Sequence, residues 1–138
     1  MAGVLLKMTA EKYKGRLELY NPSSPVTLTT AYATIFNISG EGFIDMMKLA
    51  FTNITDVFVK VTIDNEIYYE INLSDLKNRV KLTKDEQDTF LNTAHNAFSD
   101  SYPVPLFFES SLQVEVKKDT GAKRKIKGGI IRYRLRGD

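Results

Sequence analysis

Few residues of this chain have the type and spacing that catalysis or metal binding requires. His95 is the only histidine and there is no cysteine, which excludes disulfides, thiolate zinc sites and thiol nucleophiles. The acidic cluster Asp85, Glu86 and Asp88 has neither the spacing nor the glycine of a calcium loop, and it suits the first turns of a helix. We therefore expect no catalytic residue, no metal site and no cofactor.

Three further motifs resemble functional sites but have simpler explanations. Glu66 and Glu70 share the polar face of one predicted strand, as a glycosidase pair does, yet nothing else singles them out. Ser39-Gly-Glu-Gly42 lacks the Lys-Ser/Thr continuation of a phosphate-binding loop and is typical of a turn. Arg136-Gly137-Asp138 matches the integrin-binding tripeptide, which chance explains in an arginine-rich strand.

The strongest candidate for function is the charge near the C-terminus. The net charge is only +2, and the first 116 residues carry ten basic against fifteen acidic side chains. Nine of the nineteen Lys and Arg residues lie between Lys117 and Arg136, where Asp119 is the only acid. We predict that these bases form an interaction surface made of Lys117, Lys118, Lys123, Arg124, Lys125, Lys127, Arg132, Arg134 and Arg136.

This basic segment could face one of three surroundings: nucleic acid, an acidic protein surface or solvent. Lys and Arg contacts to phosphate dominate non-specific affinity for nucleic acid. Single-strand platforms also interleave aromatic residues, and here only Tyr133 is interleaved, on the core face. An acidic protein surface, such as the acidic body of a second copy, would be held in register by the same charges. The third alternative is solvent, because charges on an edge strand block aggregation.

A hairpin lies at the centre of the chain. Residues 57–63 alternate between aliphatic and other side chains, which puts the three valines and Ile63 on the core side. Asp64-Asn65 fits a two-residue turn, since both residue types tolerate left-handed geometry. The return strand, residues 66–73, continues the alternation with Ile67 on the core side.

Several other segments predict strands. Residues 12–20 form a strand with Leu17 and Leu19 inward, residues 26–38 a long strand, and residues 43–51 a strand between two others. Two late strands follow, around residues 112–116 and 130–136. In the last strand the apolar residues lie on one face and the three arginines on the other.

One segment predicts a helix on a connection between strands. Thr83 suits the N-cap, and Glu86 three residues later completes a capping box. Apolar residues at three- and four-residue spacing continue the helix to about Phe98. The prolines of Tyr102-Pro-Val-Pro105 end it.

These elements predict an all-β fold with one short helix, an antiparallel β-sandwich that is jelly-roll-like. The 138 residues suffice for one domain with its own core. We expect residues 1–20 to be an N-terminal arm or an edge strand, and residues 21–138 to be a single sandwich domain. No run approaches the about 18 apolar residues that a membrane span needs, so we expect no membrane partner.

Three stretches resemble small virion proteins of tailed bacteriophages. They are Gly40-x-Gly42-Phe-Ile44, the strand ending Val61-Thr-Ile-Asp64, and Pro105-Leu-Phe-Phe-x-Ser-Ser-Leu-Gln-Val114. Asn65 stands where the family commonly has glycine, and the likeness covers about residues 35–135. It implies a non-enzymatic β-sandwich of the virion, made in the host cytoplasm. Such a protein is a head decoration, head fibre or tail-associated part that contacts capsid or tail proteins and is often a homo-oligomer.

Two other functions stay open on the sequence. A small basic nucleic-acid-binding β-domain would use the same Lys and Arg residues on phosphate. A carbohydrate-binding sandwich would need exposed aromatic side chains along a groove, and Tyr68, Tyr102, Phe107 and Phe108 are available although the chain has no tryptophan.

Overall fold

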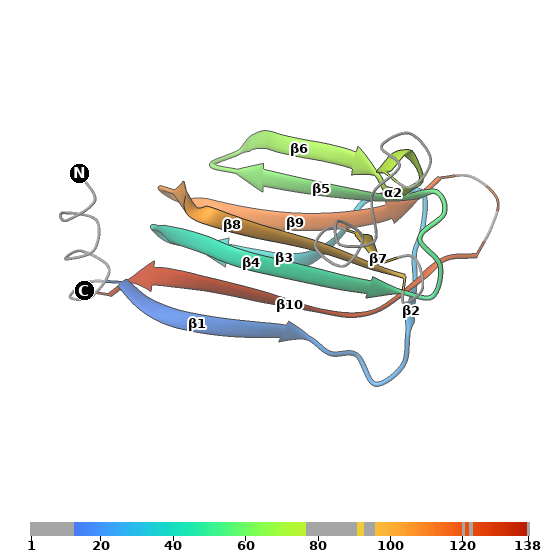
Figure 1. Cartoon of the computed structure of the whole chain (residues 1–138), viewed down its shortest axis with the longest axis horizontal. Coiled ribbons are helices and arrows are strands. Elements are labelled where there is room, and N and C mark those ends of the chain that lie inside the picture. Colours follow the sequence, from blue (N-terminus) through green and yellow to red (C-terminus); the bar gives the residue numbers. More distant parts are fainter. Residues whose placement is uncertain (1–12, 77–90, 93–95, 120, 122, 138) are drawn as a thin grey trace.

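The computed structural model describes residues 13–76, 91–92, 96–119, 121 and 123–137. Most of them are in strands (Figure 1). The elements are β1 (Tyr13–Tyr20), β2 (Val26–Thr27), β3 (Ala33–Ser39), β4 (Gly42–Phe51), β5 (Val57–Ile63), β6 (Glu66–Asn72), α2 (Leu73–Asp75), β7 (Leu91–Asn92), β8 (Ala97–Phe108), β9 (Ser111–Lys118) and β10 (Lys125–Arg136).

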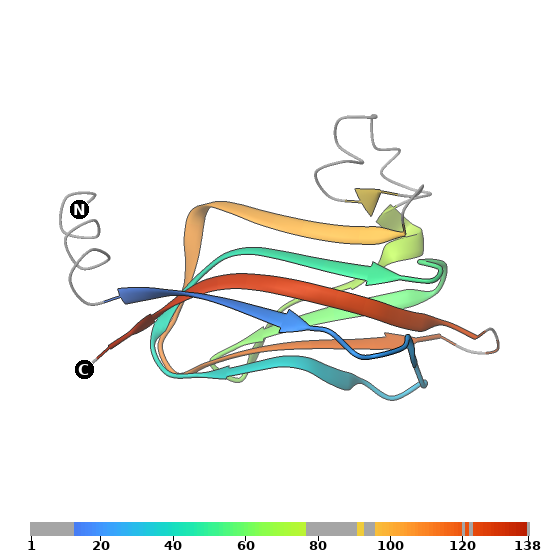
Figure 2. The ribbon, with the colours of Figure 1, turned by 90° about the horizontal axis from the view of Figure 1, so that it is seen from below.

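The strands form two antiparallel sheets that pack face to face (Figure 2). Sheet A has the order β1-β10-β4-β8-β7, with β2 also paired to β10, and sheet B has the order β3-β9-β5-β6. Apart from the short β2 and β7, the chain changes sheets between consecutive strands, except at the β5–β6 hairpin. This alternation is the winding of an eight-stranded jelly roll, so the predicted fold class is confirmed.

The core lies between the sheets and follows the alternation that the sequence predicts. Val57, Val59 and Val61 of β5 are fully buried, as are the aliphatic residues of β9. In β10, Ile131 and Tyr133 are buried while the arginines between and after them point outward. A period of two along a strand sends alternate side chains to opposite faces, which explains why these strands could be predicted.

The predicted hairpin turn is confirmed, and Tyr69, Ile71 and Leu73 of the predicted return strand keep their phase toward the core, but Ile67 does not. Asp64 and Asn65 both have left-handed geometry, with φ of 52° and 66°. A β-bulge follows, because Val61 pairs with Tyr69 whereas Thr62 pairs with Ile67. The extra residue reverses the side on which Ile67 lies, and its side chain is 60% exposed instead of facing the core.

The long strand predicted over residues 26–38 is wrong, because the segment changes sheets. Its first part is β2, which pairs with β10 in sheet A, and its last part is β3, which pairs with β9 in sheet B. Between them Leu28 is buried and its amide donates to the carbonyl of Arg124. A chain that crosses from one layer to the other cannot stay in a single ladder.

The C-terminal end of the predicted helix is not helical in the structure. Its start at Thr83 and the residues up to 90 lie outside the described part of the chain. Leu91 and Asn92 form β7 and pair with Phe98 and Ala97 of β8, so the predicted C-terminal end is a strand pair. Tyr102-Pro-Val-Pro105 lies within β8, at a register shift against β4, where the missing proline donors interrupt no regular ladder.

Gly40 and Gly42, at the entry to β4, serve two different purposes. Gly40 has a φ of 122°, which only glycine adopts readily, so the predicted turn is confirmed. Gly42 is needed for space, because a Cβ there would lie 2.1 Å from the carbonyl oxygen of Arg134. The close approach of β4 to β10 therefore depends on this residue.

Candidate interaction surfaces

Several charged and polar groups on the outer face of sheet B are paired within the chain, while Ile67 of β6 is exposed there. Lys60 Nζ lies 3.6 Å from Glu115 Oε1 and 4.2 Å from the centre of the Tyr32 ring. The Tyr32 hydroxyl donates to Glu70, and burial together with this hydrogen bond raises the pKa of Tyr32 above its usual value. Lys117 also lies over the Tyr32 ring, 5.0 Å from its centre. Such a surface satisfies its own charges and polar groups.

The outer face of sheet A is different, because it exposes leucines along its edge. Leu17 and Leu19 of β1 are 61% and 59% exposed. They pair with Arg132 and Ile130 of β10, whose neighbour Ile131 faces the core, so both leucines point outward. The prediction that they face the core is wrong, because the register between β1 and β10 places them on the opposite side.

A shallow apolar depression continues from Leu19 across this face. It has a volume of about 330 Å³ and is formed by three neighbouring strands of sheet A. Gly128 and Gly129 of β10 add no side chain to it, and the Cβ position of Gly129 faces Leu49 in the core. Its lining residues are Leu19, Lys48, Ala50, Gly128, Gly129 and Ile130.

The predicted arginine ladder lies beside the leucines and is partly neutralised. Arg132 Nε and Arg134 Nε lie 3.8 Å and 3.7 Å from the same Asp45 carboxylate on β4. Arg136 donates to Glu41 Oε2 at 2.8 Å. These acids come from the strand and turn next to β10 in space, which the sequence order hides.

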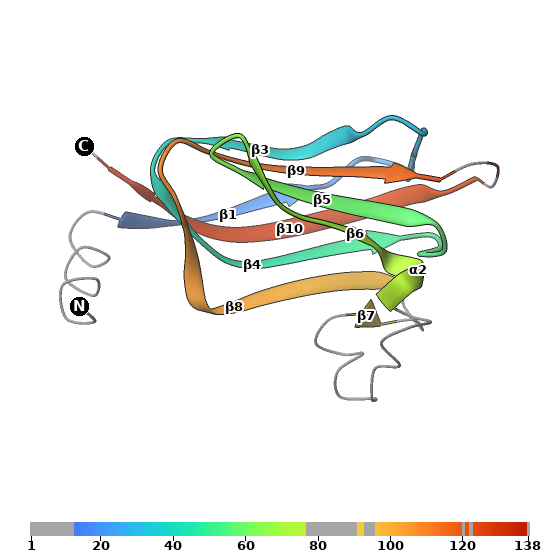
Figure 3. The ribbon, with the colours of Figure 1, turned by 90° about the horizontal axis from the view of Figure 1, so that it is seen from above.

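The other predicted bases lie at the far end of β10, around the β9–β10 connection (Figure 3). Lys118, Lys123, Lys125 and Lys127 are at least partly exposed. Arg124 is committed to the fold, because its Nε donates to the Thr55 carbonyl at 2.6 Å. The nine bases therefore do not form one patch. They divide into this end group, with Lys117 on the outer face of sheet B, and the arginines on the outer face of sheet A.

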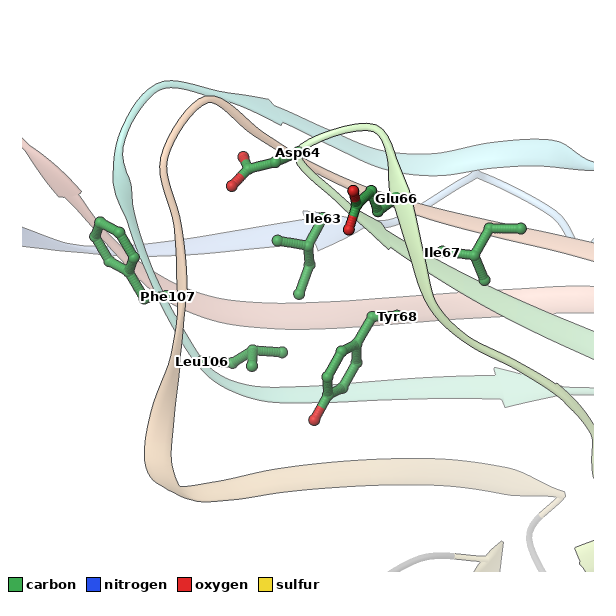
Figure 4. A pocket seen from close by; sticks show the side chains of 7 residues that line it. All are labelled: Ile63, Asp64, Glu66, Ile67, Tyr68, Leu106 and Phe107. Carbon is green, nitrogen blue, oxygen red and sulfur yellow. The ribbon is translucent and has the colours of Figure 1, made fainter.

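A pocket of about 290 Å³ opens at the end of the sandwich that carries the β5–β6 turn. Figure 4 shows side chains that line it, with Ile63 and Leu106 between Phe107 on one side and Ile67 on the other. Tyr68 and Phe107 are 54% and 40% exposed. Of the aromatic residues considered for carbohydrate binding, these two reach the pocket while Phe108 is buried in the core and the Tyr102 side chain is outside the described part.

The Asp64 side chain connects two turns at this end of the molecule. Its carboxylate accepts hydrogen bonds from the backbone amides of Glu109, Ser110 and Ser111, at 2.8–3.0 Å, and from the Ser110 hydroxyl. These bonds, foremost that from the Glu109 amide, lower the pKa of Asp64 from 3.8 to about 2. The side chain thereby ties the β5–β6 turn to the β8–β9 turn, which the sequence motif did not reveal.

The structure brings no catalytic or metal constellation together among the residues that it describes. His95, Asp85, Glu86 and Asp88 lie outside them. Within them, no three acidic or histidine side chains are placed to hold a metal ion. The Glu70 carboxylate accepts a hydrogen bond from the Tyr32 hydroxyl. Glu66 is exposed and lines the end pocket. No helix among the described residues is long and apolar enough to cross a membrane.

Comparison with known proteins reveals similarity of fold only. No family model matches the chain, and no curated protein is similar to it in sequence. Among solved structures, the VP2 protein of the infectious bursal disease virus subviral particle is similar with a TM-score of 0.51 and 10% identity. The match covers 92% of this chain and 34% of VP2, so the chain spans about a third of that protein.

A serine protease of Aeromonas sobria is similar with a TM-score of 0.42 and 6% identity, over 94% of this chain and 29% of the protease. At such identities a likeness says nothing about activity. The chain is thus an eight-stranded jelly roll, similar in fold to part of a protein that builds a viral particle.

Proposed function

We propose that this chain is a non-enzymatic structural component of a virus particle and acts through protein–protein contacts. The observation that carries the proposal is the outer face of sheet A, where Leu17 and Leu19 are exposed beside an apolar depression. Exposed apolar surface of this kind marks a contact with another protein. The jelly-roll winding and the likeness to VP2 support the setting of a particle.

The finer form of the proposal comes from the sequence motifs. The Gly40-x-Gly42 and Val61-Thr-Ile-Asp64 stretches resemble small virion proteins of tailed phages, in which this chain would be a head decoration, head fibre or tail part. Its partners would then be capsid or tail proteins and further copies of itself. Its location would be the virion, after synthesis in the host cytoplasm.

The test is whether the chain is present in the particle. Antibodies against the purified protein should label virus-like particles made by the organism that encodes it, when these are viewed by electron microscopy. Mass spectrometry of the purified particles should detect the chain in proportion to the coat protein. Particles that lack the chain would contradict the proposal.

A binding assay separates this function from the basic nucleic-acid-binding alternative. Two of the three arginines of the ladder share one carboxylate and the third is paired with Glu41, so we expect weak DNA binding. A filter assay over a series of salt concentrations measures this directly. Tight binding with a steep salt dependence would favour the alternative, because each released counterion adds to the slope.

A further inference from the structure

The free edge of sheet A carries a second feature that the proposed function does not use. β1 pairs with β10 along its whole length, from Tyr13 opposite Arg136 to Tyr20 opposite Gly129, and its other side pairs with no strand in the described part of the chain (Figure 1). Unpaired backbone donors and acceptors on such an edge are a template for another strand.

The charges of β1 are complementary to those of a second β1. Its central residues read Arg16-Leu17-Glu18. In an antiparallel pair of identical strands centred on Leu17, each Arg16 lies opposite the Glu18 of the other copy. The two Leu17 side chains lie opposite each other on the outer face. A two-fold axis makes the contact self-complementary, as closed dimers require.

Neighbouring registers do not share this property. If the second strand is shifted so that the pair is centred on Arg16, the two Arg16 side chains lie opposite each other. If it is centred on Glu18, the two Glu18 side chains do. Like charges directly opposite across strands are destabilising. If the centre of the strand pair falls between two residues instead of on one, Leu17 and Leu19 of one copy lie on the opposite face of the joined sheet from those of the other copy. A centre on Arg16 does place each Lys14 opposite a Glu18, and a centre on Glu18 places Leu17 opposite Leu19. Only the centre at Leu17 pairs opposite charges without any like-charge pair and also puts leucines opposite each other.

The side chains of β1 leave the edge accessible for such a partner. Arg16 and Glu18 are exposed and lie opposite Tyr133 and Ile131, on the side of the strand that faces the core layer. Gly15 has open space where a Cβ would be and no positive φ, so nothing in its own chain requires a glycine there. In the proposed register Gly15 lies opposite Leu19 of the other copy and gives this exposed side chain room.

We propose that two copies of this chain pair antiparallel through β1, centred on Leu17, so that their A sheets form one continuous sheet. The inference rests on the proposed structural function, for which it names one partner. Association through a single strand buries little area, so we expect a dimer with a Kd of about 10 µM or weaker in solution. In a particle, other contacts would add to it.

Charge exchange at the two central positions tests the register. Arg16→Glu and Glu18→Arg, made separately in the full chain, each create like-charge pairs and should weaken self-association at least about tenfold in sedimentation or light scattering. A mixture of these two variants should form a heterodimer, because both facing pairs, residue 16 of each copy opposite residue 18 of the other, then have opposite charges. The double variant with both changes should dimerise like the wild type.

A matched change and a folding measurement complete the experiment. Lys14→Glu changes the charge by the same amount but faces Tyr20 of the other copy, so association should change much less. Circular dichroism should show each variant folded, since all three side chains are exposed. A wild type that stays monomeric up to millimolar concentration, or single variants that associate like it, would overturn the pairing. A double variant as weak as the singles would overturn the register. Particle labelling is independent of these outcomes, so the proposed function can stand when the pairing fails.

Discussion

The two outer faces of the sandwich differ in how many of their side chains find a partner within the chain. On sheet B, Lys60, Glu115 and Tyr32 contact one another or nearby groups, and the face needs no partner to satisfy them. On sheet A, Leu17 and Leu19 stay exposed beside arginines that share acids from the neighbouring strand. The core residues of both sheets are equally well buried. The comparison shows that the two sheets differ in their outer surfaces, and it is the reason why we propose sheet A as the contact face, although Ile67 of sheet B is exposed as well.

The largest expected effect on stability comes from a substitution that separates two strands of sheet A. Gly42→Ala puts a Cβ 2.1 Å from the Arg134 carbonyl, so β4 and β10 must separate locally. We expect the free energy of unfolding to fall by about 3 kcal/mol or more in a urea titration. Gly15→Ala, in the same sheet but in open space, should instead be neutral or stabilise by about 0.5–1 kcal/mol. Equal midpoints for the two variants would refute the steric role of Gly42.

The next effect concerns the connection between the two sheets at the end pocket. Asp64→Asn keeps a residue that tolerates a φ of 52° but removes the charge that accepts four hydrogen bonds. We expect a loss of about 1.5–3 kcal/mol at neutral pH, measured by urea denaturation. Asn65→Gly, at a φ of 66° in the same turn, is the control and should not destabilise.

The same substitution gives a pH signature. The pKa of Asp64 is lowered from 3.8 to about 2 on folding, so its contribution to stability is complete above pH 3.8 and is lost as the pH falls toward 2. The difference in unfolding free energy between the wild type and Asp64→Asn should therefore shrink over that interval. A difference that stays constant down to pH 2 would show that the carboxylate is not the cause.

A third change tests whether sheet A is the contact face. Leu17→Ser with Leu19→Ser replaces two exposed leucines, so the stability of the monomer should change by no more than about 0.5 kcal/mol per site. Association with itself or with the particle should weaken at least about tenfold. Ile67→Ser, a similarly exposed apolar residue on sheet B, is the matched control. If all these variants weaken association equally, the two faces do not differ in function.

The smallest effect should be found on the polar face of sheet B. Tyr32→Phe removes the hydroxyl that donates to Glu70 and leaves the ring on which Lys60 lies. We expect a loss of about 0.5–1.5 kcal/mol in thermal or urea denaturation and no change in association. Tyr68→Phe, at a more exposed tyrosine of the same sheet, should change stability less. A change in association with Tyr32→Phe would mean that sheet B also binds a partner.

The nine bases of the predicted interaction surface do not lie together in the structure. The nine bases are adjacent in the chain, but a strand as long as β10 carries its two halves to opposite ends of the sandwich. Asp45 and Glu41, which pair with the arginines, are remote in sequence and enter only through the β4–β10 register. Whether these residues form an interaction surface stays a prediction.

The sequence alone determined what depends on neighbours along the chain. The alternation of Val57–Ile63 and of β10, and the left-handed pair Asp64-Asn65, follow from side-chain period and turn chemistry, which are local. Only the tertiary structure decided what depends on non-local pairing. The register against β10 turned Leu17 and Leu19 outward, and a single bulge reversed Ile67. A strand has two faces of equal geometry, and only its partner strand determines which of them meets the core.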